Sequence, residues 1–108
     1  MADDIRKLPD SELEVMQVIW QHEPPVARAD VERDITERRP MAQTTLLTLI
    51  TRLAEKGFLI IEKNGRASSY TPLIARSDYL AAQSRRFIDK LTREELDELR
   101  ELLGRGEL

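Results

Sequence analysis

The sequence predicts a mostly helical fold with a small antiparallel sheet, and three observations lead to this prediction. Apolar residues recur at helical spacing in several segments, which prolines or glycines separate. One segment, Phe58–Lys63, is rich in β-branched and aromatic residues instead, which favours a strand. The dipeptide Asn64-Gly65 follows it directly and is the strongest short signal for a hairpin.

The first predicted helix covers about Asp10–Gln21. Ser11 and Glu14 have the residue types and the spacing of a capping box, in which two side chains satisfy free N–H groups at a helix start. Pro24-Pro25 ends the helix region, because a proline disfavours helical geometry in the residue before it and has no N–H to donate.

A helix-turn-helix unit is predicted next. A short strand at Val26–Arg28 leads to a second helix over about Ala29–Arg38. The tight connection Arg39–Gln43 then leads to a third helix over about Gln43–Lys56, which Gly57 is placed to end. One apolar stripe of the third helix falls at i, i+3, i+4 and i+7, and it consists of Leu46, Leu49, Ile50 and Leu53.

A hairpin follows the third helix, with strands at Phe58–Lys63 and Ala67–Leu73. Asn64-Gly65 predicts a type I′ turn, which places Lys63 opposite Arg66 at the hairpin tip. The face that packs on the domain then carries Leu59, Ile61 and Tyr70. A helix followed at once by a basic hairpin is typical of a winged helix-turn-helix domain, which we expect over residues 8–74.

Residues 75–108 have helical spacing again and predict an appended arm. A fourth helix begins near Ser77, and Thr92 with Glu95 forms a second capping box that opens a fifth. We interpret the arm as a helical dimerisation element; the alternative is that it folds back over its own domain. Two-fold symmetry, which sets two recognition helices about one DNA turn apart, favours dimerisation. The seam would comprise Tyr79, Leu80, Phe87, Ile88, Leu91, Leu96, Leu99 and Leu103.

Composition excludes several classes of function. The chain has no cysteine, one histidine and no long apolar run, so disulfides, thiolate or His-rich metal sites and a transmembrane span are excluded. No secretory signal is predicted, and a cytoplasmic protein without metal or cofactor is expected. No nucleophile motif, phosphate-binding glycine loop or metalloprotease motif is present, so we expect no enzymatic activity.

The charge distribution matters more than the net charge of −3. Residues 1–27 carry two basic and six acidic residues, and residues 75–108 carry seven and eight. Residues 28–66 carry eight basic and six acidic residues and form the one segment with a basic excess. A basic segment suits nucleic acid, although charged runs usually mark solvated faces.

The exposed face of the third helix is hydroxylated rather than densely charged. By itself this indicates a core helix with a polar outer face. The tight turn before the helix and the basic hairpin after it instead favour a recognition helix that contacts DNA bases. Threonine contacts phosphates, bases and thymine methyl groups. Arg52 pairs either with a phosphate or with Glu55. The predicted DNA-contacting residues are Thr44, Thr45, Leu47, Thr48, Arg52, Lys63 and Arg66.

Three segments resemble the penicillinase-repressor family, which includes the methicillin-resistance and copper-responsive repressors. They are LPDSELEVMQVIW (8–20), TTLLTLITRLAEKGFL (44–59) and GRASSYTPL (65–73). The resemblance implies a homodimeric winged-helix repressor on a palindromic double-stranded DNA operator of β-lactamase, penicillin-binding or stress-response genes. It implies that Thr44, Thr45, Thr48 and Arg52 face the DNA, and that Lys63 and Arg66 belong to the wing.

Several residues depart from the family's pattern. Leu47 stands where the family often has Lys or Arg, and Ala27 where a Thr cap is usual. No Cys-x-Cys pair is present for copper sensing. Leu91 runs directly into Thr92, without the apolar segment in which a signalling protease cuts the family's members, so proteolytic release is not expected. Leu47 and the overall acidity also motivate an alternative, a winged-helix module that binds proteins without sequence-specific DNA binding.

Overall fold

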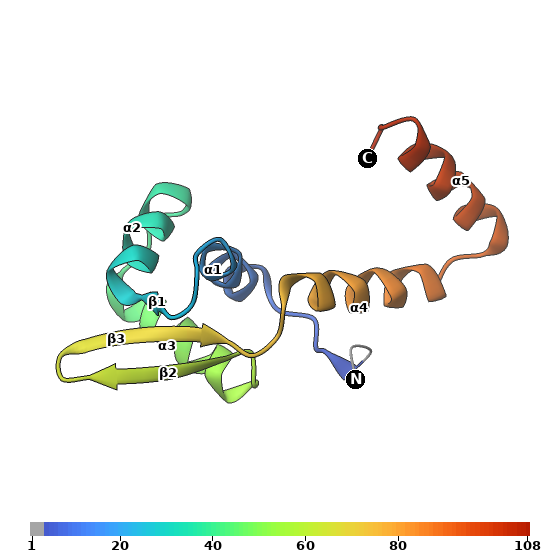
Figure 1. Cartoon of the computed structure of the whole chain (residues 1–108). Coiled ribbons are helices and arrows are strands. Elements are labelled where there is room, and N and C mark those ends of the chain that lie inside the picture. Colours follow the sequence, from blue (N-terminus) through green and yellow to red (C-terminus); the bar gives the residue numbers. More distant parts are fainter. Residues whose placement is uncertain (1–3) are drawn as a thin grey trace. The chain divides into compact units, whose positions relative to one another are not determined.

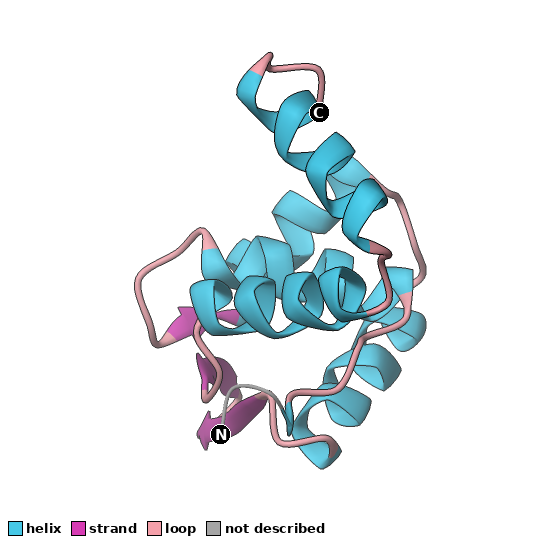
Figure 2. Ribbon diagram, turned by 90° about the vertical axis from the view of Figure 1, so that its right-hand side faces the viewer, coloured by secondary structure: helices cyan, strands magenta, loops and turns pink. Residues whose placement is uncertain are grey.

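The computed structural model describes residues 4–108, which form two compact units. Residues 6–76 make up the N-terminal unit, and residues 77–108 with residues 4 and 5 make up the arm. Within the described residues, helices predominate and the strands belong to one small sheet (Figure 2). The predicted fold class, mostly helical with a small antiparallel sheet, is confirmed.

The N-terminal unit contains three helices and three strands, as the sequence predicts (Figure 1). The sheet has the order β1-β3-β2, and both pairs are antiparallel. The central strand is therefore β3, because the short β1 pairs with it on the side away from β2. The elements are α1 (Asp10–Trp20), β1 (Val26–Ala27), α2 (Arg28–Arg38), α3 (Gln43–Glu55), β2 (Leu59–Asn64) and β3 (Ala67–Pro72).

The core of this unit lies between the three helices and the sheet. The predicted stripe of α3 is buried along its whole length, and no member is more than 5% exposed. Gly57 follows with φ +82°, the left-handed geometry that ends a helix, so its predicted role is confirmed. The α3 stripe packs with the other buried residues of the unit, chief among them Val15, Met16, Val18, Ile19, Val31, Ile35, Phe58, Leu59 and Tyr70.

Two polar contacts tie distant parts of the N-terminal unit together. Lys56 Nζ lies 2.5 Å from Oε1 of Glu12, a carboxylate that is only 4% exposed, and so links α1 to the residue that ends α3. Trp20 Nε1 donates to the carbonyl oxygen of Ile74 at 2.9 Å, which joins the end of α1 to the segment after β3. Nothing in the sequence indicates the first contact, because 44 residues separate its partners.

Two local predictions for this unit are wrong. The residue before α1 is Pro9, and no side chain caps it, so Ser11 lies inside the first turn and forms no capping box. The hairpin turn lies one residue later than predicted: Asn64 pairs with Ala67 and Lys63 pairs with Ser68. Gly65 alone has a positive φ, +64°, as at the first central position of a type II′ turn, so the glycine rather than the asparagine selects the turn.

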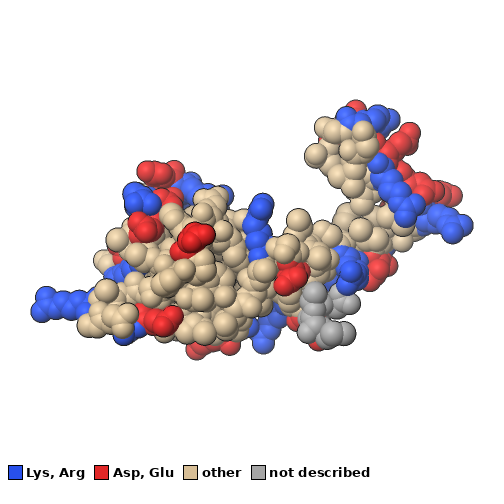
Figure 3. Space-filling model, in the orientation of Figure 1, with Lys and Arg blue, Asp and Glu red and all other residues tan. Residues whose placement is uncertain are grey.

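The arm contains α5 (Arg93–Gly104) and all of α4 (Arg76–Asp89) except its first residue, which belongs to the N-terminal unit. The predicted capping box is confirmed: Glu95 N donates to Thr92 Oγ1 at 3.1 Å, and Thr92 N donates to Glu95 Oε1 at 2.9 Å. No residue of α5 is buried. Charged side chains of α5 cover one side of the helix and leave uncharged surface on another (Figure 3). No helix in residues 4–108 is long and apolar enough to cross a membrane.

Candidate nucleic-acid interface

The exposed face of α3 carries the predicted threonines. Thr44, Thr45 and Thr48 are exposed, and Leu47 beside them is half-buried. Thr48 Oγ1 donates to the carbonyl oxygen of Thr44 at 2.9 Å. Because a hydroxyl has a single hydrogen, Thr48 in this rotamer offers an acceptor to a base and keeps its methyl group for apolar contact. The face is therefore a small-residue surface with few donors.

Arg52 lies beside this threonine face. A shallow depression of about 300 Å³ on α3 is lined by Leu47, Thr48, Thr51, Arg52 and Glu55. Among residues 4–108, the Arg52 side chain has no ion pair, with Glu55 or with any other carboxylate. Of the two alternatives left open by the sequence, the intrahelical pair is therefore absent, and the guanidinium is available to an external anion.

The hairpin supplies two further exposed cations. Lys63 is the second-last residue of β2, and Arg66 lies in the hairpin turn, directly after Gly65. Basic side chains project from this end of the sheet, at the left in Figure 3. Neither side chain has a hydrogen bond or an ion pair within the described part of the chain. The corrected register moves Arg66 from a strand position into the turn but keeps both cations at the hairpin tip.

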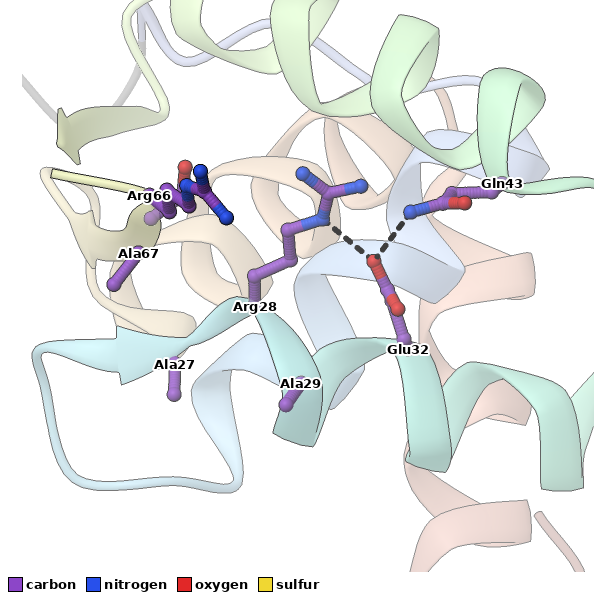
Figure 4. Close-up of a pocket in the computed structure, with 8 residues that line it drawn as sticks. Ala27, Arg28, Ala29, Glu32, Gln43, Arg66 and Ala67 are labelled. Carbon is purple, nitrogen blue, oxygen red and sulfur yellow. Dashed lines mark hydrogen bonds and ion pairs between the residues drawn. The ribbon is translucent and has the colours of Figure 1, made fainter.

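A third group of polar residues lies where α2 and α3 begin. Arg28 Nε donates to Oε1 of Glu32 at 2.6 Å, and Gln43 Nε2 donates to the same oxygen at 3.3 Å (Figure 4). The hydrogen bond to Glu32 raises the pKa of Arg28 above its usual value, so the guanidinium stays charged. Reasoning from the sequence did not assign a role to these residues, although Arg28 and Glu32 have the i, i+4 spacing of a helical ion pair.

The other charges of α2 are largely paired. Arg33 contacts Oδ1 of Asp30 at 3.1 Å and Oδ1 of Asp34 at 3.0 Å. His22 Nε2 lies 2.5 Å from Oδ2 of Asp34. The hydrogen bond from His22, together with that from Arg33, holds the pKa of Asp34 below its usual value. The charges in the middle of α2 are therefore neutralised by partners within residues 4–108, whereas Arg52 of α3 and the two cations of the hairpin are not.

A helix-turn-helix with its outer face exposed and a basic hairpin beside it has the layout of a winged-helix DNA-binding domain. The penicillinase repressor family model matches residues 8–105. The chain belongs to the penicillinase repressor family. Members of this family with curated names include the penicillinase repressor of Bacillus licheniformis, which is 36% identical over 86 residues. That alignment covers 80% of this chain and 66% of the relative, so the chain spans about two thirds of that relative's length.

A further relative matches along nearly its whole length. The methicillin resistance regulatory protein MecI of Mammaliicoccus sciuri is 30% identical over 123 residues, covering 97% of this chain and 99% of the relative. Among solved structures, the DNA-binding domain of the repressor BlaI superposes with a TM-score of 0.62 at 38% identity, covering 70% of this chain and 92% of that one. The winged-helix fold of the penicillinase repressor family is thereby established for this chain.

One solved neighbour contains DNA. The monomeric form of Bacillus licheniformis BlaI in complex with the blaP half-operator superposes with a TM-score of 0.59 at 38% identity, again over 70% of this chain and 92% of that one. The assignment of individual DNA-contacting residues in this chain stays a prediction. The predicted set does lie together on one unit, on α3 and the hairpin tip, and is exposed except for the half-buried Leu47.

Proposed function

We propose that two copies of this chain bind a palindromic operator and repress the genes beside it, with α3 in the major groove and the hairpin on the phosphate backbone. The general class, a DNA-binding transcriptional repressor, is that of the penicillinase repressor family. The observation that carries the proposal is that three cations without an internal partner in residues 4–108, Arg52, Lys63 and Arg66, lie on α3 and the hairpin tip. Arg28, Arg33 and Arg39 of the same unit are each paired with a carboxylate.

The roles of the residues follow from their chemistry. Thr44, Thr45 and Thr48 approach base edges and thymine methyl groups, and Leu47 adds apolar contact in place of a charged side chain. Arg52, Lys63 and Arg66 contact phosphates, which fixes orientation without reading sequence. Three cations give one copy few phosphate contacts, so useful affinity depends on two copies that bind together.

Titration of DNA duplex at several salt concentrations tests the phosphate contacts. The double variant Lys63→Ala/Arg66→Ala is expected to weaken specific and non-specific binding about equally and to lower the salt slope by about two. The matched control, Lys7→Ala/Arg105→Ala, removes one exposed Lys and one exposed Arg outside the interface and should leave the slope unchanged. A slope that stays the same in the wing variant contradicts the proposal.

The homodimer is proposed from the apolar surface of the arm. Leu80 is 63% exposed, Phe87 56% and Leu103 60%, which is unusual for side chains of this size in a single chain. Of the other predicted seam residues, Tyr79 is already buried, and Leu91 lies after the end of α4. We propose that the exposed members, together with Ile88, Leu96 and Leu99, meet a second copy.

Sedimentation of the chain and of the variant Leu99→Glu/Leu103→Glu tests the dimer. The wild type is expected to sediment as a dimer and the variant as a monomer, with operator affinity lowered at least about tenfold. Arg105→Glu, a charge reversal outside the leucine stripe of α5, serves as the control. A variant that stays dimeric shows that the seam lies elsewhere. A well-folded dimer that binds no DNA favours the protein-interaction module instead.

Release of the DNA is proposed to occur without cleavage between α4 and α5. Only Lys90, Leu91 and Thr92 separate the two helices. Thr92 is held in the capping box, which leaves little extended backbone for a protease to engage. An alignment over 123 positions also necessarily opens gaps against a chain of 108 residues, so this chain lacks residues within the length that it shares with MecI.

A further inference from the structure

A cavity of about 340 Å³ lies where the start of α2, the start of α3 and the hairpin turn meet. We call it the arginine pocket. In Figure 4 the guanidinium of Arg28 lies between the side chains of Arg66 and Gln43. Small residues form much of the remaining wall, so the space between the two arginines is open. The lining consists of Ala27, Arg28, Ala29, Glu32, Gln43, Arg66, Ala67 and Ser68.

The contacts of Arg28 leave the two terminal nitrogens of its guanidinium available to a ligand. Its Nε is used by Glu32 at 2.6 Å, and within residues 4–108 its two terminal nitrogens have no recorded partner. Arg66 lines the same cavity, and its side chain has no partner in that part of the chain either. Two planar guanidinium groups around one open space match the oxygens of a phosphate better than they match a single carboxylate, because a phosphate has more acceptors.

The position of the pocket indicates which phosphate it meets. Gln43 is the first residue of α3 and directly precedes the threonine face, and Arg66 belongs to the hairpin turn. The pocket therefore lies between the two elements proposed above to contact DNA. When α3 enters the major groove of a DNA duplex and the hairpin tip holds its backbone, the DNA strand between these two contacts passes over this cavity.

We propose that the arginine pocket binds one phosphate of the DNA backbone through Arg28 and Arg66, and that Glu32 limits the affinity of this site while it orients Arg28. This inference rests on the proposed function and adds Arg28 as a DNA-contacting residue and Glu32 as a positioning residue. Glu32 holds Nε of Arg28 and the amide of Gln43 on one oxygen, which fixes the guanidinium at the cavity. Its negative charge, at the same time, repels the phosphate.

Arg28→Ala tests the contact, with Arg33→Ala as the matched control. Both variants remove one arginine from α2, but Arg33 does not line the pocket. A mixed-sequence duplex that spans two half-sites is a sufficient probe, because phosphate contacts are independent of sequence. Arg28→Ala is expected to weaken binding about tenfold and to lower the salt slope by about one, relative to Arg33→Ala. Equal affinities and slopes for the two variants overturn the inference.

Glu32→Gln tests the role of the carboxylate, because glutamine keeps an oxygen that accepts from Arg28 but loses the charge. Its control, Asp30→Asn, removes a negative charge from the same helix outside the pocket. Glu32→Gln is expected to bind DNA about two- to fivefold more tightly than Asp30→Asn does. Binding that is no tighter than the control overturns the limiting role of Glu32.

A double-mutant cycle of Arg28→Ala and Arg66→Ala tests whether both arginines hold the same phosphate. Shared binding predicts that the double variant loses clearly less affinity than the sum of the single losses, whereas separate phosphates give additive losses and overturn the shared site. Wild-type chain without salt-dependent DNA binding would overturn the proposed function itself. Wild-type binding with Arg28→Ala indistinguishable from Arg33→Ala would overturn this inference alone. Circular dichroism of each variant verifies the fold.

Discussion

Helices α3 and α5 carry leucines at the same intervals but meet different surroundings. In α3 the leucines at i, i+3 and i+7 are Leu46, Leu49 and Leu53, and all three are buried. In α5 the same intervals are occupied by Leu96, Leu99 and Leu103, and none of them is buried. An amphipathic pattern therefore shows that a helix needs an apolar partner but does not show where the partner is. For α3 it lies within the chain; for α5 we propose a second copy.

The two helices also begin differently. The residue before α3 is Ala42, and no side chain caps the helix there. Before α5, Thr92 and Glu95 form a complete capping box. Helix α3 is thus stabilised mainly by burial, whereas α5 has local stabilisation that does not depend on a core. Four predictions extend this comparison to other contacts of the N-terminal unit and of α5, starting with the largest expected effect.

Leu53→Ala is expected to lower the free energy of unfolding by about 2–5 kcal/mol, because it leaves a cavity at a residue that is 0% exposed. Leu103→Ala, at a residue that is 60% exposed, should change the unfolding of the monomer by less than about 0.5 kcal/mol. Urea denaturation at low protein concentration measures both. Similar losses in the two variants would show that α5 is packed within its own chain.

Lys56→Met is expected to cost about 3 kcal/mol, because it leaves the buried Glu12 carboxylate without its counter-charge. Arg100→Met on α5 is the control: Arg100 pairs with Asp97 at 3.6 Å, but the side chains are 72% and 66% exposed, and such pairs contribute less than about 1 kcal/mol. Adding Glu12→Gln to Lys56→Met should recover part of the loss. No recovery would show that the stem of Lys56, rather than its charge, is what matters.

Thr92→Ala is expected to cost α5 about 1 kcal/mol, because it removes a hydrogen bond to the first turn of the helix. The reciprocal change, Ala42→Ser, should stabilise α3 by a similar or smaller amount, since Ala42 already has the extended geometry of a cap. Amide hydrogen exchange in the first turn of each helix measures both effects. Unchanged exchange at Glu95 in Thr92→Ala would contradict the local stabilisation of α5.

Asp34→Asn is expected to have the smallest effect on folding stability, and the size of this effect should depend on pH. The hydrogen bond from His22 depresses the pKa of Asp34 in the folded state, so its stabilisation is present above the unfolded pKa of about 3.9 and is lost as pH falls through the folded pKa. Melting temperatures of the variant and the wild type should differ near pH 6 and converge as pH falls below the folded pKa of Asp34. Asp97→Asn on α5 is the control. If its melting temperature differs from that of the wild type with the same pH dependence, the effect at Asp34 does not come from the His22 contact.

Much of the fold could be predicted because it depends on local rules. The α3 stripe follows from helical periodicity, Gly57 from the left-handed geometry of a helix end, and the Thr92 capping box from spacing alone. Ser11 and Glu14 have the same spacing, but the N-cap of α1 is Pro9, two residues before Ser11. The sequence pattern of a capping box is therefore present without its hydrogen bonds. The hairpin turn was predicted correctly at Gly65, but both its register and its type I′ geometry were wrong, because Asn64 pairs with Ala67 and no residue next to Gly65 has a positive φ.

The remainder depends on contacts between distant residues, which no local rule provides. The Glu12–Lys56 pair and the pairing of Val26 with Tyr70 join positions that only the folded chain brings together. The arginine pocket is of the same kind, because Arg66 reaches it from the hairpin and Arg28 from α2. The predicted site residues on α3 and the hairpin were accessible from sequence because each element carries its own signal.

The hydrogen bond from Trp20 to Ile74 has a practical consequence for measurements on this chain. Trp20 is the sole tryptophan of the sequence, and both partners of the bond belong to the N-terminal unit. Indole emission is sensitive to its surroundings, so intrinsic fluorescence follows the melting of that unit, whereas far-ultraviolet circular dichroism sums over every helix, including α4 and α5. Two transitions that fail to coincide would separate the stability of the arm from that of the N-terminal unit without any label.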